Sequence, residues 1–268
     1  MHETSDKTQT IDDLIDPARA TAMHATLGLG DTAPQQGNDL PPFWHHIYFW
    51  DPKAPDALGR DGHPKVGTGL IPDLGLGQRM WAGGALDFIQ PITIGMPATK
   101  ISRVESVVEK TGRSGKLGFV TLRHQVFQNQ ILKVSERQDI VYKVPSKPGA
   151  HPQTQQARTD ETVSVPAQFD TTLLFRYSAL TFNGHRIHYD LDYCKTVEGY
   201  AGLVVHGPLL AQHLIQLANR ELGAINTFEF RAVSPLMHFE GAEICMASDG
   251  EMWVRGPGGR LCMTARAS

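Results

Sequence analysis

Apolar positions recur with a helical period at the start of the chain and with a strand period further on. Apolar residues three and four positions apart predict a helix over residues 10–27, which Pro17 can divide into two pieces. Aromatic residues gather over 41–50, and the glycine- and proline-rich stretch 51–84 is expected to be a long loop of the kind that often lines a site. The pattern that follows predicts an antiparallel meander of strands over residues 85–90, 100–110, 116–127 and 130–144.

The second part of the chain predicts short helices, one long helix and then strands. Residues 169–180 are expected to form a helix with Asp170 at its N-cap. Residues 181–190 are expected to form a loop, and residues 192–198 a short helix. After the long helix, strands are expected over residues 226–231, 242–247, 251–255 and 260–267.

The long helix has the clearest start signal in the sequence. Gly207 is expected at its N-cap and Pro208 at its first helical position. Apolar residues then line one face as far as Leu222, and Gly223 ends the helix. The start of such a helix presents unpaired N–H groups and a partial positive charge, which can hold an oxygen that becomes negative during a reaction. A plain helix start is the alternative.

The composition limits the domain count and the classes of partner. The chain has 268 residues, enough for one large or two small domains, and residues 144–162 have the proline-rich, polar composition of a linker. We therefore expect an N-terminal unit over 1–143 and a C-terminal unit over 163–268. The net charge of −3 argues against nucleic-acid binding, and no apolar run is long enough for a membrane helix. The three widely spaced cysteines fit neither a disulfide framework nor a zinc site and suggest the cytoplasm.

Histidine is abundant, with 12 residues, and is concentrated just before the long helix. Asn183, His185 and His188 lie in the predicted loop, and His206 directly precedes Gly207. Imidazole titrates near neutral pH and suits general acid or base catalysis, so the two spots offer a proton-transfer group and a cradle for an oxyanion. A polar loop whose histidines bond backbone groups is the alternative. No third ligand at a recognisable spacing supports a metal site.

The run SALTFNGHRIHYD at 178–190, followed by GLVVHGP at 202–208, resembles the MaoC-like hydratase/dehydratase family. The likeness is to the branch of mesaconyl-C4-CoA hydratases and mitochondrial-type 3-hydroxyacyl-thioester dehydratases. Residues 16–20 and 40–44 also resemble that branch, so the resemblance covers nearly the whole chain. It implies an α+β double hotdog, with two halves that each wrap an antiparallel sheet around a central helix. It also implies that only one half, here the C-terminal one, keeps the catalytic residues.

The family's motif reads Asp, any residue, Asn, Pro, any residue, His. On this chain its histidine falls on His188, its aspartate position on Asn183 and its oxyanion donor on Gly207. The resemblance therefore implies that these are the catalytic residues. Asparagine cannot accept a proton as aspartate does, so His188 is expected to carry most of the proton transfer, with Asn183 holding a water. His185 or Asp190 can assist.

The resemblance also implies a substrate. We expect a hydro-lyase that adds water reversibly to a short branched enoyl-CoA, mesaconyl-C4-CoA or itaconyl-CoA, to give citramalyl-CoA. The free carboxylate of a mesaconyl group would suit Arg186 or Arg176, with His185 and His206 also near the substrate. Surface ion pairs are the alternative for both arginines. No metal or cofactor is expected because the thioester is itself the electron sink, and a homodimer is possible.

Other functions stay open. The same reaction can run as dehydration of a linear (R)-3-hydroxyacyl thioester in fatty-acid metabolism. A hotdog thioesterase commonly has an acid on its central helix, where this chain has only Glu221 at the far end. A non-enzymatic acyl-CoA binder is the remaining alternative. The N-terminal half is expected to hold no acid–base group, and His45 and His46 are expected to be structural.

Overall fold

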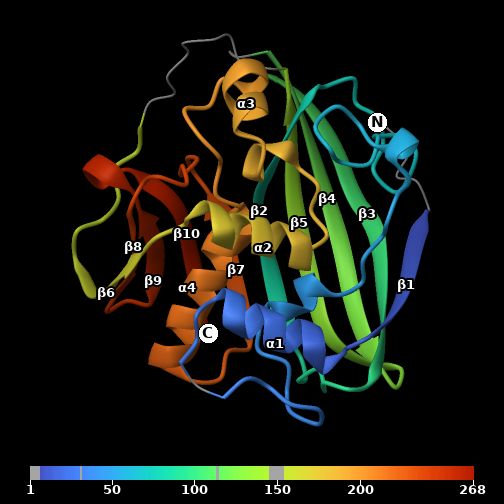
Figure 1. The fold of residues 1–268 in the computed structure, drawn as a ribbon, viewed down its shortest axis with the longest axis vertical. Helices are drawn as coiled ribbons and strands as arrows, with labels where there is room; N and C mark the ends of the chain where they lie inside the picture. Colours follow the sequence, from blue (N-terminus) through green and yellow to red (C-terminus); the bar gives the residue numbers. More distant parts are fainter. Residues whose placement is uncertain (1–6, 31, 113–114, 145–153) are drawn as a thin grey trace.

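The computed structural model describes residues 7–30, 32–112, 115–144 and 154–268. Its strands form one ten-stranded antiparallel sheet that curves around a central helix (Figure 1). The strands are β1 (Thr8–Leu14), β2 (Gln78–Phe88), β3 (Pro97–Gly112), β4 (Gly115–Gln128), β5 (Ile131–Lys143), β6 (Glu161–Ala167), β7 (Thr227–Ala232), β8 (Ala242–Ala247), β9 (Glu251–Arg255) and β10 (Leu261–Ala267). The helices are α1 (Pro17–Thr26), α2 (Thr171–Leu180), α3 (Leu191–Tyr193) and α4 (Gly207–Leu222). In the described residues no helix is long and apolar enough to cross a membrane.

The sheet is built from two halves with the same strand order. The order β1-β3-β4-β5-β2 of the N-terminal half is repeated by β6-β8-β9-β10-β7 in the C-terminal half. The two halves join where β2 pairs with β7, with Leu86 opposite Phe228. This repetition is the architecture that the predicted double hotdog requires, since each half places its first strand at an outer edge and its second at the centre.

The two halves differ in the segment between their first and second strands. In the C-terminal half this segment contains α4, a helix of 16 residues. Among the described residues between β1 and β2, the only α-helix is α1, with 10 residues. The long central helix expected in each half is therefore present in the C-terminal half, while the N-terminal half uses its length for the extended loop before β2.

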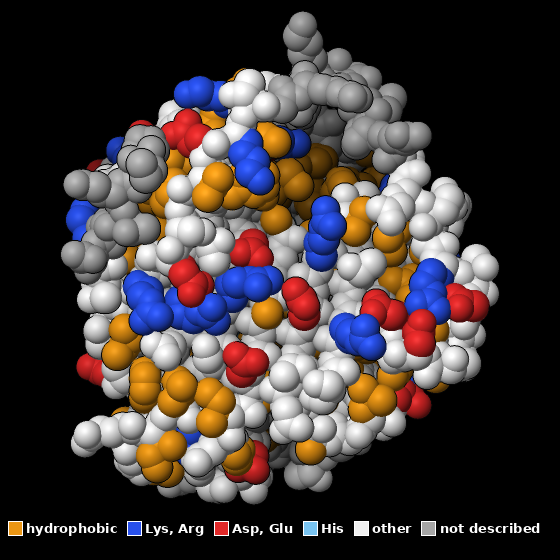
Figure 2. Space-filling view, turned by 180° about the vertical axis from the view of Figure 1, so that it is seen from behind, with side chains coloured by type: hydrophobic (Ala, Val, Ile, Leu, Met, Phe, Trp, Pro, Cys, Tyr) orange, Lys and Arg blue, Asp and Glu red, His pale blue; other side chains and the backbone are white. Residues whose placement is uncertain are grey.

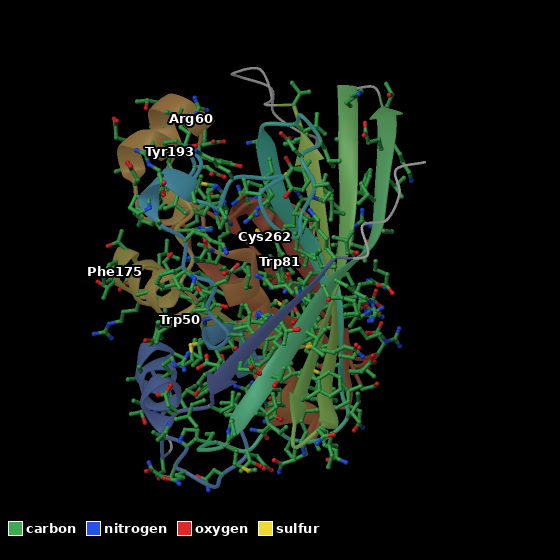
Figure 3. The ribbon with its side chains drawn as sticks, turned by 90° about the vertical axis from the view of Figure 1, so that its right-hand side faces the viewer. Trp50, Arg60, Trp81, Phe175, Tyr193 and Cys262 are labelled. Carbon is green, nitrogen blue, oxygen red and sulfur yellow. The ribbon has the colours of Figure 1, made fainter. Side chains whose placement is uncertain are left out.

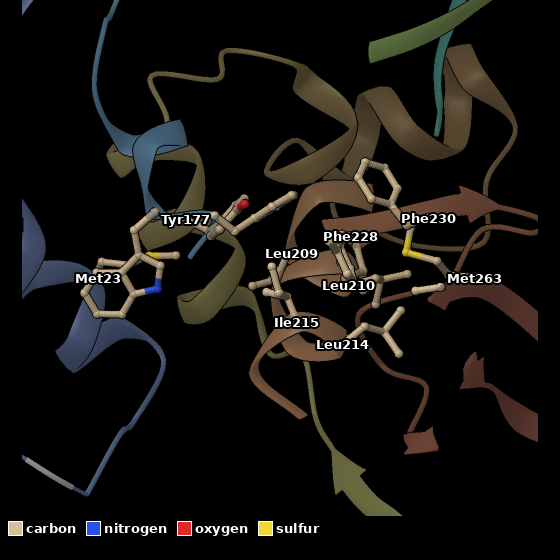
Figure 4. Packing of buried hydrophobic residues seen from close by; sticks show 14 of the residues in the cluster. Met23, Tyr177, Leu209, Leu210, Leu214, Ile215, Phe228, Phe230 and Met263 are labelled. Atoms are coloured by element: carbon tan, nitrogen blue, oxygen red, sulfur yellow. The ribbon is translucent and has the colours of Figure 1, made fainter. Parts of the chain in front are cut away.

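Helix α4 lies in the core shared by both halves. Leu209 and Leu214 on α4 are fully buried, and so is Phe228 on β7. Figure 4 shows the leucines of α4 facing the aromatic side chains of β7 and Met263 of β10. Burying a side chain of this size contributes roughly 1.5–3 kcal/mol, so α4 is firmly held and its first residue has a fixed position.

Within the described part of the chain, the helices lie on one side of the sheet and leave its outer face uncovered (Figure 1, Figure 3). Figure 2, which views the molecule from behind, shows basic and acidic side chains interspersed across the middle of this face. The pair Arg123–Glu105 at 3.0 Å is one example and joins β4 to β3. Mixed charges of this kind keep an uncovered sheet face in water, so the chemistry must be sought on the inner face.

The N-terminal helix predicted over residues 10–27 is wrong in its first half. Residues Thr8–Leu14 form β1, which pairs with β3, and α1 begins only at Pro17. The Asp16 carboxylate accepts a hydrogen bond from the Arg19 N–H and caps the helix. Proline therefore starts this helix, as its missing N–H allows, instead of interrupting a longer one.

Two boundaries in the middle of the chain also differ from the prediction. β2 begins at Gln78, inside the predicted loop, and includes Gly83 and Gly84. Both glycines lie against neighbouring strands so closely that a larger residue would not fit. A Cβ on Gly83 would lie 2.6 Å from the carbonyl oxygen of Phe230. β6 begins at Glu161, inside the predicted linker 144–162, of which residues 145–153 lie outside the described part of the chain. The proposed domain boundaries stay a prediction.

Candidate active site

His188 is buried beneath the start of α4. It ends a short 3₁₀ turn, Arg186–His188, inside the segment predicted as loop, and its side chain is only 6% exposed. Its Nδ1 lies 2.7 Å from the carbonyl oxygen of Val204 and donates a hydrogen bond to it. That bond leaves Nε2 as the acceptor of the neutral ring. Burial lowers the pKa of His188 to about 4, so at neutral pH the ring is unprotonated.

Three further histidines surround this ring, and we call the set His63, His185, His188 and His206 the His188 cluster. The His206 ring stacks on His188 with 3.7 Å between centroids, and His185 meets it edge-on at 5.3 Å. His206 is fully buried, and its Nε2 lies 2.8 Å from Ser178 Oγ on α2. Its Nδ1 has no partner among the described residues. Burial and the neighbouring imidazoles hold the pKa of His206 well below its usual value, so the cluster is neutral at rest.

His63 joins the cluster from the long loop of the N-terminal half. Its ring lies 4.2 Å from that of His185, and its Nδ1 lies 2.9 Å from Asp61 Oδ2. Burial acts to raise the pKa of Asp61, but the side-chain and backbone hydrogen bonds from His63 outweigh it, and the pKa lies well below its usual range. A hydrogen-bonded carboxylate–imidazole pair thus lies in the half that was expected to hold no acid–base group, and the long loop borders the His188 cluster. The non-catalytic role expected of this half stays a prediction.

Backbone contacts fix this loop against the C-terminal half. The Arg186 N–H donates to the Asp61 carbonyl oxygen at 2.9 Å. Gly62 has a φ of +87°, and a Cβ there would lie 2.0 Å from the Gly184 carbonyl oxygen. Only glycine fits this approach. The short sequence Asp61-Gly62-His63 was the available signal for the pair, but its glycine- and proline-rich surroundings gave no reason to choose it.

Gly207 lies at the start of α4, one residue further into the helix than predicted, because His206 is the N-cap. Its N–H belongs to the first turn and has no acceptor within the helix. A Cβ on Gly207 would lie 2.9 Å from the Trp81 ring, which itself stacks on Phe230 at 4.5 Å. Glycine therefore lets the Trp81 ring pack directly against the helix start, while Gly207 itself stays partly exposed.

The remaining predicted residues lie at the edge of the cluster or outside it. The Asn183 side-chain oxygen accepts a hydrogen bond from the His185 N–H at 3.0 Å, which shapes the loop. Arg186 forms an ion pair with Asp190 at 2.7 Å, the alternative that the sequence left open, and Arg176 is exposed on α2. Figure 3 shows Arg60 beside Tyr193 on the layer of helices and Trp81 on the side of the sheet. The substrate-binding roles of Arg186 and Arg176 stay predictions.

A second set of buried histidines lies in the N-terminal half. The Nε2 atoms of His45 and His46 lie 3.0 and 2.9 Å from the carboxylate of Glu136, and Gln138 Nε2 donates to it at 2.8 Å. We call these four residues the Glu136 cluster. Burial acts to raise the pKa of Glu136, but the charge and hydrogen bonds of the two histidines outweigh it, and the pKa lies well below its usual value. The bonds support the structural role expected for His45 and His46.

Two sets of side chains have the residue types of a metal site. Asp61, His63 and His185 form one, and His45, His46 and Glu136 form the other, with candidate ligand atoms within 4.8 Å of one another in each. In both sets the carboxylate is already hydrogen-bonded to a histidine of the same set. The expectation that no metal or cofactor is needed stays a prediction.

Comparison with known proteins decides the family. The model of the family described as hydroxyacyl-thioester dehydratase type 2 matches residues 43–238, a stretch that contains the whole His188 cluster and Gly207. The chain belongs to the hydroxyacyl-thioester dehydratase type 2 family. This confirms the resemblance drawn from the motif, and membership makes the chain a hydro-lyase. It also sets aside the thioesterase and the non-enzymatic binder that the sequence left open.

Curated relatives in this family include hydratases and dehydratases. The chain is 40% identical over 265 residues to the mesaconyl-C(4)-CoA hydratase of Chloroflexus aurantiacus, covering 97% of this chain and 94% of that protein. It is 24% identical over 241 residues to the mitochondrial hydroxyacyl-thioester dehydratase type 2 of Schizosaccharomyces pombe, covering 80% of each.

Comparison with solved structures confirms the fold. The HtdX protein of Mycobacterium tuberculosis aligns with a TM-score of 0.68 at 20% identity, over 97% of this chain and 99% of that chain. A MaoC-like dehydratase from Phytophthora capsici aligns with a TM-score of 0.70 at 11% identity, over 99% and 96%. A further Mycobacterium tuberculosis protein described as a double hotdog aligns at 0.60 with 11% identity, over 98% and 95%. The predicted double hotdog is thus confirmed.

Proposed function

We propose that the protein is a hydratase that adds water reversibly to mesaconyl-C4-CoA to form citramalyl-CoA. The observation that carries this proposal is the 40% identity, over nearly the full length of both chains, to a mesaconyl-C(4)-CoA hydratase. The site supports the reaction type, since a buried neutral imidazole lies near an open helix start. Itaconyl-CoA, an isomer with the same free carboxylate, is the second substrate to test.

In this proposal Gly207 and His188 divide the chemistry. The thioester carbonyl oxygen accepts a hydrogen bond from the Gly207 N–H, which stabilises the enolate as it forms. His188 Nε2 accepts a proton from a water that attacks the β-carbon, and the proton then returns to the α-carbon. The hydrogen bond from Nδ1 to Val204 supports this role, because it keeps the accepting lone pair on Nε2. Asn183 keeps its predicted role of holding the water, although its side-chain oxygen already accepts one bond.

The ligand, the groups that bind it, the location and the assembly of the protein belong to the same proposal. An acyl-CoA thioester is the expected ligand, and its anionic groups would be met by local arginines and backbone N–H groups, since the net charge is −3. Arg186 would have to leave Asp190 to bind a substrate carboxylate. A cytoplasmic location, a homodimer and independence from metals and cofactors are proposed with it.

Purified protein mixed with mesaconyl-C4-CoA tests the function. We expect the absorbance of the conjugated enoyl thioester to fall as water adds, and citramalyl-CoA to be the product by mass. The mass of the product formed from itaconyl-CoA, whose C=C bond is not conjugated with the thioester, orders the two branched substrates. No citramalyl-CoA from either compound, at micromolar enzyme and over hours, would rule the proposal out.

Dehydration of a linear (R)-3-hydroxyacyl thioester is the second candidate, and the family description and the fission-yeast relative favour it. Rates on mesaconyl-C4-CoA and crotonyl-CoA separate the two functions, because crotonyl-CoA lacks the free carboxylate. A kcat/KM at least tenfold higher for mesaconyl-C4-CoA supports the hydratase, and the reverse preference supports the dehydratase.

A further inference from the structure

The C-terminal motif lacks the carboxylate that its family pattern places before the catalytic histidine, because Asn183 occupies that position. A base that takes a proton from water becomes positively charged, and in a buried site that charge is costly without a nearby negative one. His188 donates its Nδ1–H to a neutral carbonyl, which offers little compensation. The site therefore needs a negative group from elsewhere.

Asp61 fits this need by position and bonding. Its Oδ2 lies 2.9 Å from His63 Nδ1, and its Oδ1 accepts the His63 backbone N–H at 3.1 Å, so the carboxylate fixes the ring. The His63 side chain is 14% exposed and lies against His185, which meets His188 edge-on. The loop that carries the pair is clamped to the C-terminal half at Gly62 and Gly184. Asp61 is thus joined to the buried base through two imidazole rings.

We propose that Asp61 and His63, supplied by the N-terminal half, replace the missing carboxylate and stabilise the proton that the His188 cluster takes from water. The inference rests on the proposed function. Both residues are positioning residues that act through His185 and His188. It follows that the two halves of the double hotdog share one active site, although the motif lies in only one of them.

The proton balance is simple. An O–H bond of water breaks, its oxygen bonds to the β-carbon, and its proton bonds to His188 Nε2. The electron pair of the C=C bond moves to the thioester as an enolate, which then takes the same proton onto its α-carbon. Asp61 stays ionised throughout, and its charge offsets the imidazolium during the interval between the two transfers. One water is consumed, and no oxidant or reductant takes part.

The charged groups around His63 set the expected pH behaviour. His63 faces Asp61 on its own loop, His185 on the neighbouring turn and Arg79 on β2. Burial lowers the pKa of both imidazoles and Arg79 adds to that effect, whereas the Asp61 charge acts against it. Removing Asp61 therefore moves the acid limb of the kcat profile to lower pH. Arg79 also argues against a divalent cation between Asp61, His63 and His185, because its charge would oppose one.

Kinetics of Asp61→Asn, Asp61→Glu and His63→Gln on both mesaconyl-C4-CoA and crotonyl-CoA test the inference. We expect Asp61→Asn to lower kcat about 100-fold with KM changed less than about twofold, and to move the acid limb to lower pH. Asp61→Glu should recover part of kcat, which a merely structural role would not predict. Asp56→Asn is the matched control, because Asp56 is an exposed carboxylate in the same loop, and it should behave as the wild type.

The outcomes separate this inference from the proposed function. Wild-type turnover of crotonyl-CoA alone overturns the mesaconyl proposal but leaves the Asp61 test intact. Wild-type kcat and an unchanged pH profile in Asp61→Asn overturn the inference, as does activity that a chelator abolishes and a divalent metal restores. If Asp61→Asn unfolds, His63→Gln decides instead, since it leaves the carboxylate and the backbone clamp in place.

Discussion

The two clusters of buried histidine differ in how completely their polar atoms are bonded. In the Glu136 cluster, His45, His46 and Gln138 all direct nitrogen atoms at one carboxylate. In the His188 cluster, Nδ1 of His206 has no partner among the described residues, and His188 bonds Val204 through its Nδ1. Buried polar atoms are normally paired, so the bonding of the Glu136 cluster is complete within the fold, whereas that of the His188 cluster is not.

Burial of a histidine alone therefore does not identify an active site. Burial lowers the pKa of His45 and of His188 to the same value of about 4. What separates them is the partner: a buried carboxylate for His45, and a single backbone carbonyl for His188. The first arrangement stabilises the fold, and the second leaves a basic nitrogen free for chemistry. Substitutions in the His188 cluster should therefore lower activity, and substitutions in the Glu136 cluster should lower stability.

His188→Ala is expected to have the largest effect on activity. It removes the proposed base, so kcat should fall by about 10³-fold with KM changed little. The melting temperature should fall by only a few degrees, since the ring makes one hydrogen bond. His46→Ala is the matched variant from the Glu136 cluster and should lower stability while kcat stays within about threefold. Near-full activity of His188→Ala would falsify the mechanism.

Gly207→Ala is expected to lower kcat by about 10²-fold. The new Cβ would lie 2.9 Å from the Trp81 ring and would narrow the approach to the N–H that receives the thioester oxygen. Steady-state kinetics and inhibition by a saturated acyl-CoA separate lost catalysis from lost binding. Gly69→Ala is the control, since a Cβ there meets nothing within 4 Å. Equal activity of the two variants would contradict the proposed oxyanion role.

Glu136→Gln is expected to lower the free energy of unfolding by roughly 2 kcal/mol, because the charged acceptor of several buried donors is lost. Turnover should stay within about twofold of the wild type. Glu105→Gln is the control, since Glu105 pairs with Arg123 on the partly exposed outer face and should cost less than about 1 kcal/mol. Urea unfolding followed by circular dichroism measures both.

The pH dependence of the same variant sharpens the result. The folded-state pKa of Glu136 lies below its unfolded value of 4.5, so its contribution is fully present above that pH and is lost as pH falls through the folded pKa. The difference in stability between wild type and Glu136→Gln should thus be constant from pH 6 to 8 and shrink below about pH 4.5. A difference that grows on acidification would show that Glu136 is protonated in the folded state.

The sequence predicts much of the C-terminal half because its signals are local. Pro208 and Gly223 mark the two ends of α4, and the observed helix differs from the prediction by one residue at its start. β8 and β9 have the predicted bounds. β1 was missed because Ile11 and Leu14 suit the helical period as well as the strand period over so short a stretch. Residues Thr8–Leu14 form a strand because they pair with β3, which lies far along the chain.

The site is predictable only where its residues share one motif. Asn183, His185 and His188 lie in a single run, and His206 and Gly207 in the next. Asp61 and His63 come from another half of the molecule, and their partner His185 is far away in sequence. Nothing local indicates that the Gly62 backbone meets Gly184. Glu136 is likewise an ordinary polar residue of a strand pattern until the fold places it against His45.

Ser178→Ala is expected to have the smallest effect on stability and probes how the His188 ring is held. Ser178 Oγ lies 2.8 Å from His206 Nε2, and the His206 ring stacks on His188 with 3.7 Å between centroids. Loss of the hydroxyl leaves a second His206 nitrogen unpaired, so the free energy of unfolding should fall by about 1 kcal/mol and kcat by about threefold. Ser164→Ala on β6, which removes a hydroxyl near Cys245, should leave kcat unchanged. If both variants keep the wild-type kcat, His206 supports the fold alone and the His188 ring is held by Val204.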